Sequence, residues 1–430
     1  MDNSLHYPLE SLRKGAPKAA YIHIPFCRRR CFYCDFAISV VGERKRGDSS
    51  ATIATYIETL LSEIEATPIL ADQPLETVFF GGGTPSLLAP EQVGEILDKL
   101  ARRFGIASAA EISMEMDPAT FDLDHVKGYR SAGINRVSVG VQAFQDDLLA
   151  AAGRFHRRAD VVRSLSLLHK AGFTNISLDL ISGLPHQTMA HWVESLEEAI
   201  ALNPAHISTY DLIVEPQTAF ARYFTPGEAP LPSDSLTAQM YIHAQKILTA
   251  EGYGHYEICN FAQRGYEAKH NLTYWNCEYN YGFGMGATSY LPQATGPQRI
   301  DRPRTQATYR NWVEDFTRQG GSTSDPVLSP SEQVIETVMM GLRLVPGISL
   351  KGIEDLYGQP GLLAISQAVA PHIKKRWVIV SSPRHKDISQ TTLSAQDHIR
   401  LSDPEGFLMS NVVITDIFNA LDCVETQAIP

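Results

Sequence analysis

The most informative segment of the sequence is Tyr21-Ile-His-Ile-Pro-Phe-Cys-Arg-Arg-Arg-Cys-Phe-Tyr-Cys-Asp-Phe36. It holds three of the six cysteines of the chain, Cys27, Cys31 and Cys34, in the spacing Cys-x3-Cys-x2-Cys. The opening residues carry no apolar signal segment, and cytosolic thiols are kept reduced, so disulfides are not expected. Three thiols this close together in a cytosolic protein indicate a metal site.

Two kinds of metal site fit three neighbouring thiols. A structural zinc site needs four ligands, usually as two pairs from separate segments. The chain has no second cysteine pair, so His23 or Asp35 would have to complete the zinc set. Thiolates are the usual ligands of iron–sulfur clusters, and three from one loop would leave a fourth iron open for a small molecule. The spacing therefore favours a cluster that takes part in chemistry, and zinc stays as the alternative.

The quoted segment resembles the cluster loop of the radical S-adenosylmethionine (SAM) superfamily. The resemblance implies that Cys27, Cys31 and Cys34 bind a [4Fe–4S] cluster. It also implies that SAM binds the fourth iron through its amino and carboxylate groups. His23 and Pro25 belong to the signature of the oxygen-independent coproporphyrinogen dehydrogenase branch.

Composition limits the class of protein. The chain has 430 residues, 44% of them apolar, and 37 Lys and Arg against 48 Asp and Glu, which gives a net charge of −11. The deficit of positive charge argues against nucleic acid as a partner, because that binding depends on Lys and Arg neutralising phosphates. No apolar run reaches the ~18–20 residues of a membrane span. We expect a globular cytoplasmic protein.

The first half of the chain alternates β-rich runs with helical patterns. Strands are predicted at Tyr21–Ile24, Thr77–Phe80, Ile112–Met116, Val137–Val141, Ile176–Ile181 and His206–Tyr210. Helices are predicted at Thr52–Glu65, Glu91–Phe104, Val161–Ala171 and His191–Leu202. Parallel strands need such crossover helices, so the pattern predicts an α/β fold with a partial (β/α)6 barrel. Sites in these folds lie at the carboxyl ends of the strands.

Two breaks in composition divide the chain. Residues 225–235 are rich in Pro, and residues 319–331 are rich in Gly, Ser, Asp and Pro. They predict a partial barrel at 16–230, an aromatic-rich extension at 231–325 and a C-terminal domain at 326–430. The C-terminal domain is expected to be a small α/β or winged-helix-like unit, with a helix over Ser331–Leu344 followed by short helices and a hairpin.

A glycine-rich loop, Phe79-Phe-Gly-Gly-Gly-Thr-Pro85, follows the second predicted strand. Consecutive glycines let the backbone turn tightly and approach a ligand closely, although a plain tight turn is an equal alternative. The loop lacks the Lys-Ser/Thr ending of a nucleotide-binding P-loop. The resemblance implies SAM contacts from Gly82, Gly83 and Thr84.

Polar side chains lie within or directly after the later predicted strands, at positions where apolar residues are usual. Any one of Glu115, Gln142, Arg154 and Asp179 could be a hydrogen-bonded core residue, but four at successive strand ends suggest a ligand site. Carboxylates suit ribose hydroxyls and an ammonium group, and arginine suits a carboxylate. The resemblance assigns all four residues to SAM, and adds two tyrosines, Tyr21 and Tyr33.

Two features choose a branch of the superfamily. The dehydrogenases carry a further cysteine two residues after the third cluster cysteine, and this chain has Phe36 there, as the HemW-type haem chaperones do. The segment His270-Asn-Leu-Thr-Tyr-Trp275 is similar to the His-Asn-x-x-Tyr-Trp motif associated with haem in the chaperones. Many chaperones have His where this chain has Thr288.

The residues around His270 are less decisive by themselves. Imidazole is a common haem ligand, but a lone His among aromatic residues is often a hydrogen-bonded structural residue. Cys259 and Cys277 could serve as alternative ligands, although their spacing does not indicate it. The resemblance implies haem contact at His270, haem and a haem-accepting protein as partners, and transfer of haem. The rival interpretation is a coproporphyrinogen dehydrogenase.

Overall fold

The structure is a computed structural model, and it describes residues 15–42, 46–47, 49–381 and 393–428, with the side chains of 356 and 423–428 left out. One mixed sheet of eleven strands forms its centre. In sheet order the strands are β13 (Gly296–Asp301), β12 (Thr288–Gln293), β11 (Asn280–Phe283), β1 (Ala19–Ile24), β4 (Leu75–Gly82), β5 (Ile106–Met116), β6 (Arg136–Gln142), β7 (Asn175–Ser182), β8 (His206–Asp211), β10 (Asn260–Ala262) and β9 (Gly254–Glu257).

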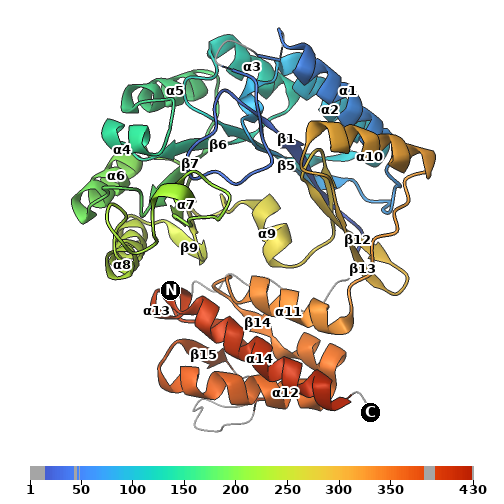
Figure 1. Cartoon of the computed structure of the whole chain (residues 1–430), viewed down its shortest axis with the longest axis vertical. Helices are drawn as coiled ribbons and strands as arrows, with labels where there is room; N and C mark the ends of the chain where they lie inside the picture. Colours follow the sequence, from blue (N-terminus) through green and yellow to red (C-terminus); the bar gives the residue numbers. More distant parts are fainter. Residues whose placement is uncertain (1–14, 43–45, 48, 382–392, 429–430) are drawn as a thin grey trace.

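The predicted (β/α)6 barrel is confirmed as the core of this sheet. Strands β1, β4, β5, β6, β7 and β8 pair in parallel in that order, and all six were predicted from the sequence. A seventh parallel strand, β11, pairs with β1 from the other side. Antiparallel strands then extend both edges, β12 and β13 at one and β10 and β9 at the other. The strands form an arc that stays open on one side (Figure 1).

Helices cover the convex side of the arc (Figure 1). They are α1 (Ala51–Ala66), α2 (Pro90–Phe104), α3 (Leu123–Ala132), α4 (Asp146–Ala151), α5 (Arg158–Lys170), α6 (Met189–Ala201), α8 (Asp234–Ala250) and α10 (Gln306–Arg318). The main apolar core lies between these helices and the sheet, and includes Ile22, Val78, Met114, Val139 and Leu178. Burial of this face supplies most of the driving force for folding.

Local sequence explains where several helices begin. Ser50 and Ser233 precede α1 and α8, and each hydroxyl accepts a hydrogen bond from a backbone N–H of the first turn. Ser329 and Glu332 form a reciprocal capping box at the start of α11 (Pro330–Gly341). These bonds satisfy N–H groups that have no partner within the helix.

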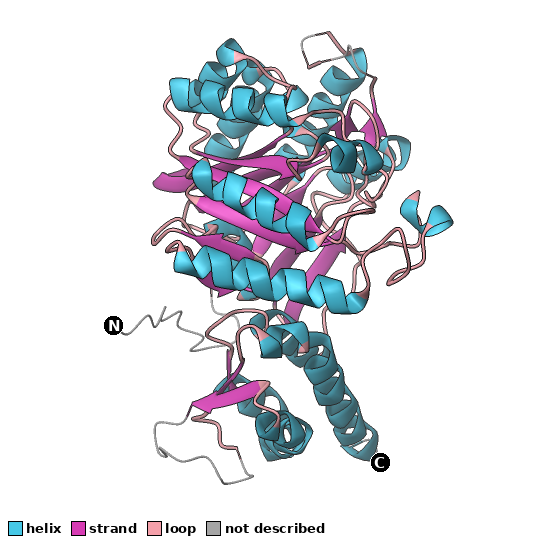
Figure 2. Cartoon of the chain, turned by 90° about the vertical axis from the view of Figure 1, so that its left-hand side faces the viewer, coloured by secondary structure: helices cyan, strands magenta, loops and turns pink. Residues whose placement is uncertain are grey.

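The C-terminal part has its own apolar core, separate from that of the barrel. After α11 it contains β14 (Ile348–Ser349), α12 (Leu350–Lys374), β15 (Val378–Ser381), β16 (His398–Leu401), α13 (Glu405–Leu408) and α14 (Ser410–Ala428). The predicted antiparallel pair is β15 and β16. The prediction of short helices was wrong for α14, which is one long helix, whereas α12 consists of two helices that meet at a kink, where Gly358 has a non-helical backbone conformation. Figure 2 shows these elements gathered at one end of the molecule.

The segment predicted as an extension, 231–325, does not stand apart from the barrel. Its strands continue both edges of the barrel sheet, and α10 packs on α1. Its short helix α9 (Lys269–Trp275) lies within the arc, on the open side (Figure 1). In the described part of the chain, no helix combines the length and apolar character needed to span a membrane.

Candidate functional site

The three predicted cluster cysteines lie on one loop at the carboxyl end of β1. The loop begins at β2 (Phe26–Cys27), which pairs with β3 (Ser39–Val40) where the chain returns. The guanidinium of Arg30 donates to the carbonyl oxygens of Cys34, Phe36 and Ile38, at 3.1, 3.3 and 3.5 Å. These bonds fold the backbone around the thiols. None of the three thiols is in a disulfide, and all are partly buried.

Two of the thiols have polar neighbours from other strand ends. Thr84 Oγ1 lies 3.6 Å from Cys27 Sγ, and Arg154 Nη1 lies 3.5 Å from Cys31 Sγ. Burial raises the pKa of the Cys27 thiol to about 12 and also raises the pKa of Cys34. A positive group would therefore be needed to hold these sulfurs as thiolates, and a bound metal centre supplies one.

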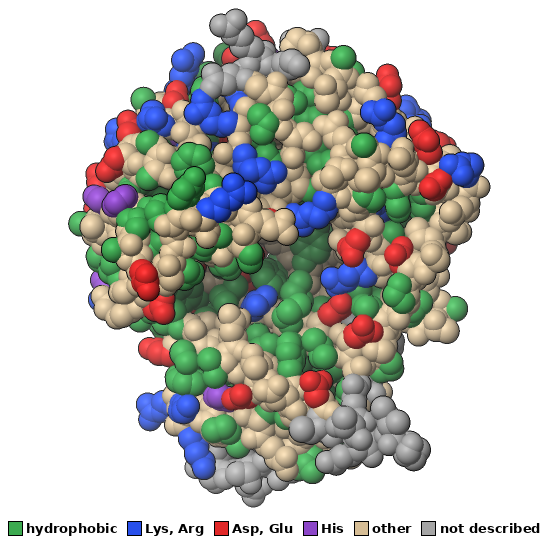
Figure 3. Space-filling model, in the orientation of Figure 1, with side chains coloured by type: hydrophobic (Ala, Val, Ile, Leu, Met, Phe, Trp, Pro, Cys, Tyr) green, Lys and Arg blue, Asp and Glu red, His purple; other side chains and the backbone are tan. Residues whose placement is uncertain are grey.

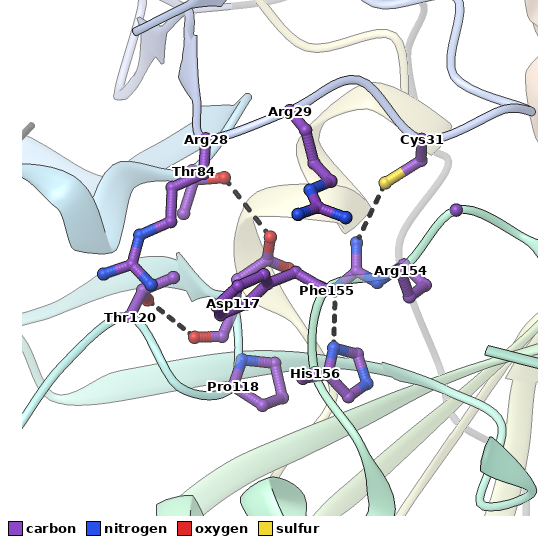
Figure 4. Close-up of a pocket in the computed structure, with 11 residues that line it drawn as sticks. Arg28, Arg29, Cys31, Thr84, Asp117, Pro118, Thr120, Arg154, Phe155 and His156 are labelled. Atoms are coloured by element: carbon purple, nitrogen blue, oxygen red, sulfur yellow. Dashed lines mark hydrogen bonds and ion pairs between the residues drawn. The ribbon is translucent and has the colours of Figure 1, made fainter. Parts of the chain in front are cut away.

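Asp117 joins the two thiol neighbours, and the sequence analysis did not select it. Its Oδ2 accepts from Thr84 Oγ1 at 3.3 Å, and its Oδ1 forms a short ion pair with Arg154 Nη2 (Figure 4). Arg154 also donates to the carbonyl oxygen of Gly140 at 2.9 Å, and its side chain is only 7% exposed. The signal was present in the sequence: Glu111, Ser113 and Glu115 alternate with apolar residues and share one face of β5, and Asp117 continues the alternation directly after the strand ends.

The glycine-rich loop makes the tight turn that its sequence predicts. Gly82 has φ +110°, and a Cβ there would lie 2.4 Å from the imidazole of His23. A Cβ on Gly83 would lie 2.8 Å from the carbonyl oxygen of Phe26. The Gly82 N–H donates to Glu115 Oε2 at 2.9 Å. The glycines are therefore required by the packing of the cluster loop against β4, whether or not a ligand approaches them.

Glu115 and Asp179 face the inside of the barrel from β5 and β7. Burial raises the pKa of Glu115 to about 8, and the nearby charge of Asp179 adds to the effect. Asp179 accepts hydrogen bonds from the hydroxyls of Ser138, Ser208 and Ser177, at 2.9, 2.8 and 3.3 Å. Burial also raises its pKa, while these hydroxyls oppose the shift. The interior of the barrel is thus polar, in contrast to the apolar layer beneath the helices.

The remaining predicted SAM residues lie around this interior. Tyr21 donates to or accepts from His23 Nδ1 at 3.0 Å, and its ring stacks on Phe79. Gln142 ends β6 with φ +67°, where the pairing with β7 is irregular. Tyr33, which lies between the second and third cysteines in the sequence, packs beside Phe220. The structure therefore brings the cluster loop, the glycine loop and the polar strand-end residues to one end of the barrel.

His270 lies deeper, toward the amino ends of the strands. Its Nδ1 is 2.8 Å from Thr77 Oγ1 and its Nε2 is 2.8 Å from the Tyr274 hydroxyl, so both ring nitrogens are hydrogen-bonded. The residue is 1% exposed, and burial lowers its pKa to about 3. The backbone N–H groups of Lys269 and His270 donate to the Glu111 carboxylate. Glu111 thereby holds the start of α9 in the barrel.

Neither His23 nor Asp35, the two residues that could complete a zinc site, is positioned as a fourth ligand. His23 uses Nδ1 toward Tyr21 and Nε2 toward the carbonyl oxygen of Ala37, at 2.8 Å. Asp35 faces Arg304 on the surface. Over the described ranges, no three His, Cys, Asp or Glu side chains converge as ligands of one metal ion. Three thiols that each bind a different iron of a cluster do not have to converge on one point.

Two cavities lie at opposite ends of the barrel. The first is lined by Cys31, Thr84, Asp117, Arg154 and the Arg28–Arg29 pair, and has only about 20 Å³, the space of one water (Figure 4). The second, about 430 Å³, lies at the amino ends of the strands between β5 and α9. On the face that carries the cluster loop, Figure 3 shows a hollow at the centre of the molecule, with Lys and Arg side chains above it.

Comparison with known proteins gives three results. The profile described as Radical SAM superfamily matches residues 21–199. The chain is 43% identical to "Heme chaperone HemW" of Synechocystis, over 94% of this chain and 97% of the relative, and 38% identical to "Heme chaperone HemW" of Bacillus subtilis, over 80% and 87%. The solved coproporphyrinogen III oxidase (HemN) of Escherichia coli superposes with a TM-score of 0.75 over 94% of this chain and 90% of that chain, at 24% identity, which shows a shared fold.

Proposed function

The chain belongs to the HemW family of haem chaperones within the radical SAM superfamily, and on this premise we propose that it binds haem and transfers it to an acceptor protein. The observation that carries the proposal is similarity along nearly the whole length of both chains, from the cluster loop to the C-terminal part. A shared barrel alone would not suffice, because one fold supports many functions.

The family implies a [4Fe–4S] cluster and SAM, and the thiols of Cys27, Cys31 and Cys34 fit the cluster. They lie on one loop, are in no disulfide and are partly buried, and Cys31 lines the small cavity at this end of the barrel (Figure 4). A cluster held by three thiolates offers an open iron to the amino and carboxylate groups of SAM. Arg154 and Thr84 would hydrogen-bond the sulfurs, and such bonds tune the potential of a cluster.

SAM would lie over the polar interior of the barrel. Glu115 and Asp179 are placed to accept hydrogen bonds from ribose hydroxyls or from an ammonium group, and Gly82 and Gly83 keep the approach free of Cβ atoms. Tyr21, Tyr33 and Gln142 surround the same region. A ligand with a positive charge near Glu115 would favour the ionised carboxylate and bring its raised pKa down.

Contact between His270 and haem stays a prediction. Both imidazole nitrogens are hydrogen-bonded, so coordination of the haem iron would first require the hydrogen bond to Thr77 or to Tyr274 to break. The variant Tyr274→Phe frees Nε2 and keeps the imidazole. If His270 is a ligand, Tyr274→Phe should bind haem at least as tightly as wild type with the same absorption spectrum, and His270→Ala should lose that spectrum.

The rival function, oxidative decarboxylation of coproporphyrinogen III, has the fold of HemN in its favour. Phe36 argues against it, since the dehydrogenases have a cysteine at this position and here an exposed aromatic side chain takes its place. Anaerobic turnover assays with coproporphyrinogen III, SAM and a reductant separate the two functions. Formation of protoporphyrinogen IX at enzymatic rates would overturn the chaperone assignment.

The direct test uses anaerobically reconstituted protein and ferric haem. We expect binding of one haem per chain and its transfer to an apo-haemoprotein, with no porphyrinogen turnover. The cluster is checked separately. Reconstitution with iron and sulfide should give a sulfide-to-iron absorption band that each of Cys27→Ala, Cys31→Ala and Cys34→Ala abolishes, whereas bound zinc in place of iron would contradict the cluster.

A further inference from the structure

We propose that haem docks on the rim of the barrel mouth, beside the cluster loop, with its macrocycle on exposed apolar side chains and its propionates on Arg28 and Arg29. The inference rests on the proposed function and deepens it by naming the surface that receives the haem. His270 lies near the amino ends of the strands, so it and this surface are alternative sites for the one haem, and the inference places the haem at the carboxyl ends. We call this surface the mouth rim. It comprises the exposed side chains of Phe32, Phe36, Val40, Phe155, Ile213 and Tyr223.

Exposed apolar side chains are concentrated at the mouth rim. The described ranges contain twelve large apolar side chains that are exposed, and six of them belong to the mouth rim. Phe36 is 64% exposed, Ile213 68% and Tyr223 77%. A polypeptide gains nothing in stability from such exposure, and contiguous apolar surface of this kind marks a binding site.

Three segments that are distant in sequence form the mouth rim. The backbone of Phe32 bonds to Ala152 on one side and to Phe220 of α7 (Phe220–Tyr223) on the other, at 3.1 Å each. The Phe32 ring lies against Gly153, two residues before Phe155 in the chain. Tyr33 and Leu212 pack on the same small core, which places Ile213 beside the cluster loop. These contacts bring Phe32, Phe155, Ile213 and Tyr223 together, and Phe36 and Val40 follow further along the cluster loop.

The charge of the mouth rim suits the two propionates of haem. The chain carries a net charge of −11, yet Arg28, Arg29 and Arg30 follow one another between the first two cysteines. The guanidinium carbons of Arg28 and Arg29 lie 5.3 and 5.4 Å from the centre of the Phe155 ring. This stacking fixes two cations beside an aromatic surface, and Figure 3 shows Lys and Arg side chains above the hollow. Guanidinium groups are well suited to pair with carboxylates.

The cavity at the other end of the barrel suits a propionate less well. It has about 430 Å³ and one wall from α9, including Lys269. Its second lysine, Lys18, is paired with Glu76 at 2.8 Å, and Glu278 also lines it. Lys18 is therefore already ion-paired, and this cavity provides the control surface for the experiment.

The test is a set of titrations with three probes: ferric haem, metal-free protoporphyrin IX and haem dimethyl ester. The double variant Arg28→Gln/Arg29→Gln should bind haem and protoporphyrin IX about tenfold more weakly than wild type, the scale of two partly exposed charge-assisted pairs. The dimethyl ester lacks the carboxylates, so the double variant should bind it as wild type does. Lys269→Gln, at the other cavity, should leave all three affinities unchanged.

A second variant avoids the cluster loop altogether. Ile213→Ser/Tyr223→Ser should weaken the binding of all three probes several-fold, because it removes apolar contact and no charge. Cluster content and SAM binding are measured in every variant, to show that the barrel is intact. If both rim variants bind haem as wild type does, the inference is overturned, and normal haem binding with slower transfer would assign the rim to the acceptor protein. If wild-type protein binds no haem, the proposed function itself fails.

Discussion

At the scale of single residues, Asp117 occupies the centre of the site. One carboxylate oxygen faces Thr84, which reaches Cys27, and the other pairs with Arg154, which reaches Cys31. Asp117 thus holds in place two side chains that hydrogen-bond the sulfurs of two predicted cluster ligands. It touches neither sulfur itself, so we regard it as a positioning residue.

Replacing Asp117 should destabilise the protein and disturb the cluster. Asp117→Ala leaves the guanidinium of Arg154 buried without its carboxylate, which should cost about 2–3 kcal/mol of unfolding free energy. The reconstituted cluster should also change its reduction potential, because its sulfurs lose fixed donors. Potentiometric titration followed by electron paramagnetic resonance measures the second effect.

The control is Asp35→Ala, which removes an exposed carboxylate next to the third cysteine. It should change stability by less than about 0.5 kcal/mol, as is usual for an exposed pair. If Asp117→Ala keeps the unfolding free energy and the cluster reduction potential of wild type, Asp117 does not position Thr84 and Arg154.

Glu115 should make the cofactor-free protein less stable as the pH rises. Its pKa is raised from 4.5 to about 8 in the folded chain, so between these values the folded state binds more protons than the unfolded state. Stability contributed by the protonated form is therefore lost from about pH 4.5 to pH 8. Glu115→Gln should remove this part of the slope and be more stable than wild type by roughly 2 kcal/mol at pH 8. Urea unfolding at several pH values measures it; parallel curves for both proteins would contradict the shift.

At the scale of elements, α9 closes the barrel from its open side. Its amino end is held by Glu111, and its His270 bonds to Thr77 of β4 and to Tyr274 within the helix. A helix of seven residues is too short to be stable alone, so these contacts determine where it lies. The motif that resembles a haem site is, in this structure, the means by which α9 is attached to the sheet.

His270→Ala should loosen α9. It removes a buried ring and leaves two hydroxyls without a partner, which together should cost about 3 kcal/mol. Hydrogen exchange should show loss of protection in α9 first. The matched control is His243→Ala on α8, where an exposed imidazole bonds only to the carbonyl of Gln239, and this change should have little effect. Equal protection of α9 in wild type and His270→Ala would contradict this role.

At the scale of the whole molecule, the C-terminal part packs on the edge of the barrel sheet through backbone bonds, polar side chains and a small apolar cluster that includes Tyr256 and Leu344. Residue Glu257 of β9 bridges to Leu344, and His255 Nδ1 lies 2.8 Å from Asp403 Oδ2. The His255 side chain is 2% exposed and stacks on Phe261 of β10. The two cores are separate, so this interface decides how firmly the two parts are joined.

Asp403→Ala should weaken this interface and leave the barrel site intact. Loss of the partner of a buried imidazole should cost about 1–2 kcal/mol. Because two cores are present, the loss should appear as faster hydrogen exchange in β9 and in the 402–408 region, ahead of the barrel strands. Cluster assembly should match wild type. A uniform increase in exchange throughout the barrel would show that the parts unfold as one unit.

The six parallel strands could be predicted from the sequence alone, and the sequence also predicts that the candidate site lies at their carboxyl ends. Hydrophobic periodicity and crossover helices strongly constrain a parallel sheet. The spacing of Cys27, Cys31 and Cys34 is a local property of the sequence and does not depend on tertiary packing. The alternation of Glu115 with Met114 and Met116 also predicted correctly which side chain would avoid the apolar core.

Which polar side chains are already hydrogen-bonded or ion-paired to one another depends on the tertiary structure. Asp117 meets Arg154 and Thr84 because three separate strand ends converge, and no local pattern encodes that meeting. His270 is enclosed because Thr77, far from it in sequence, lies opposite one of its ring nitrogens. The apolar mouth rim likewise forms from three segments, around residues 32–40, 155 and 213–223, that lie far apart in the sequence. Motifs specify residue types at short range, whereas burial and hydrogen-bond partners depend on contacts that form only when the chain has folded.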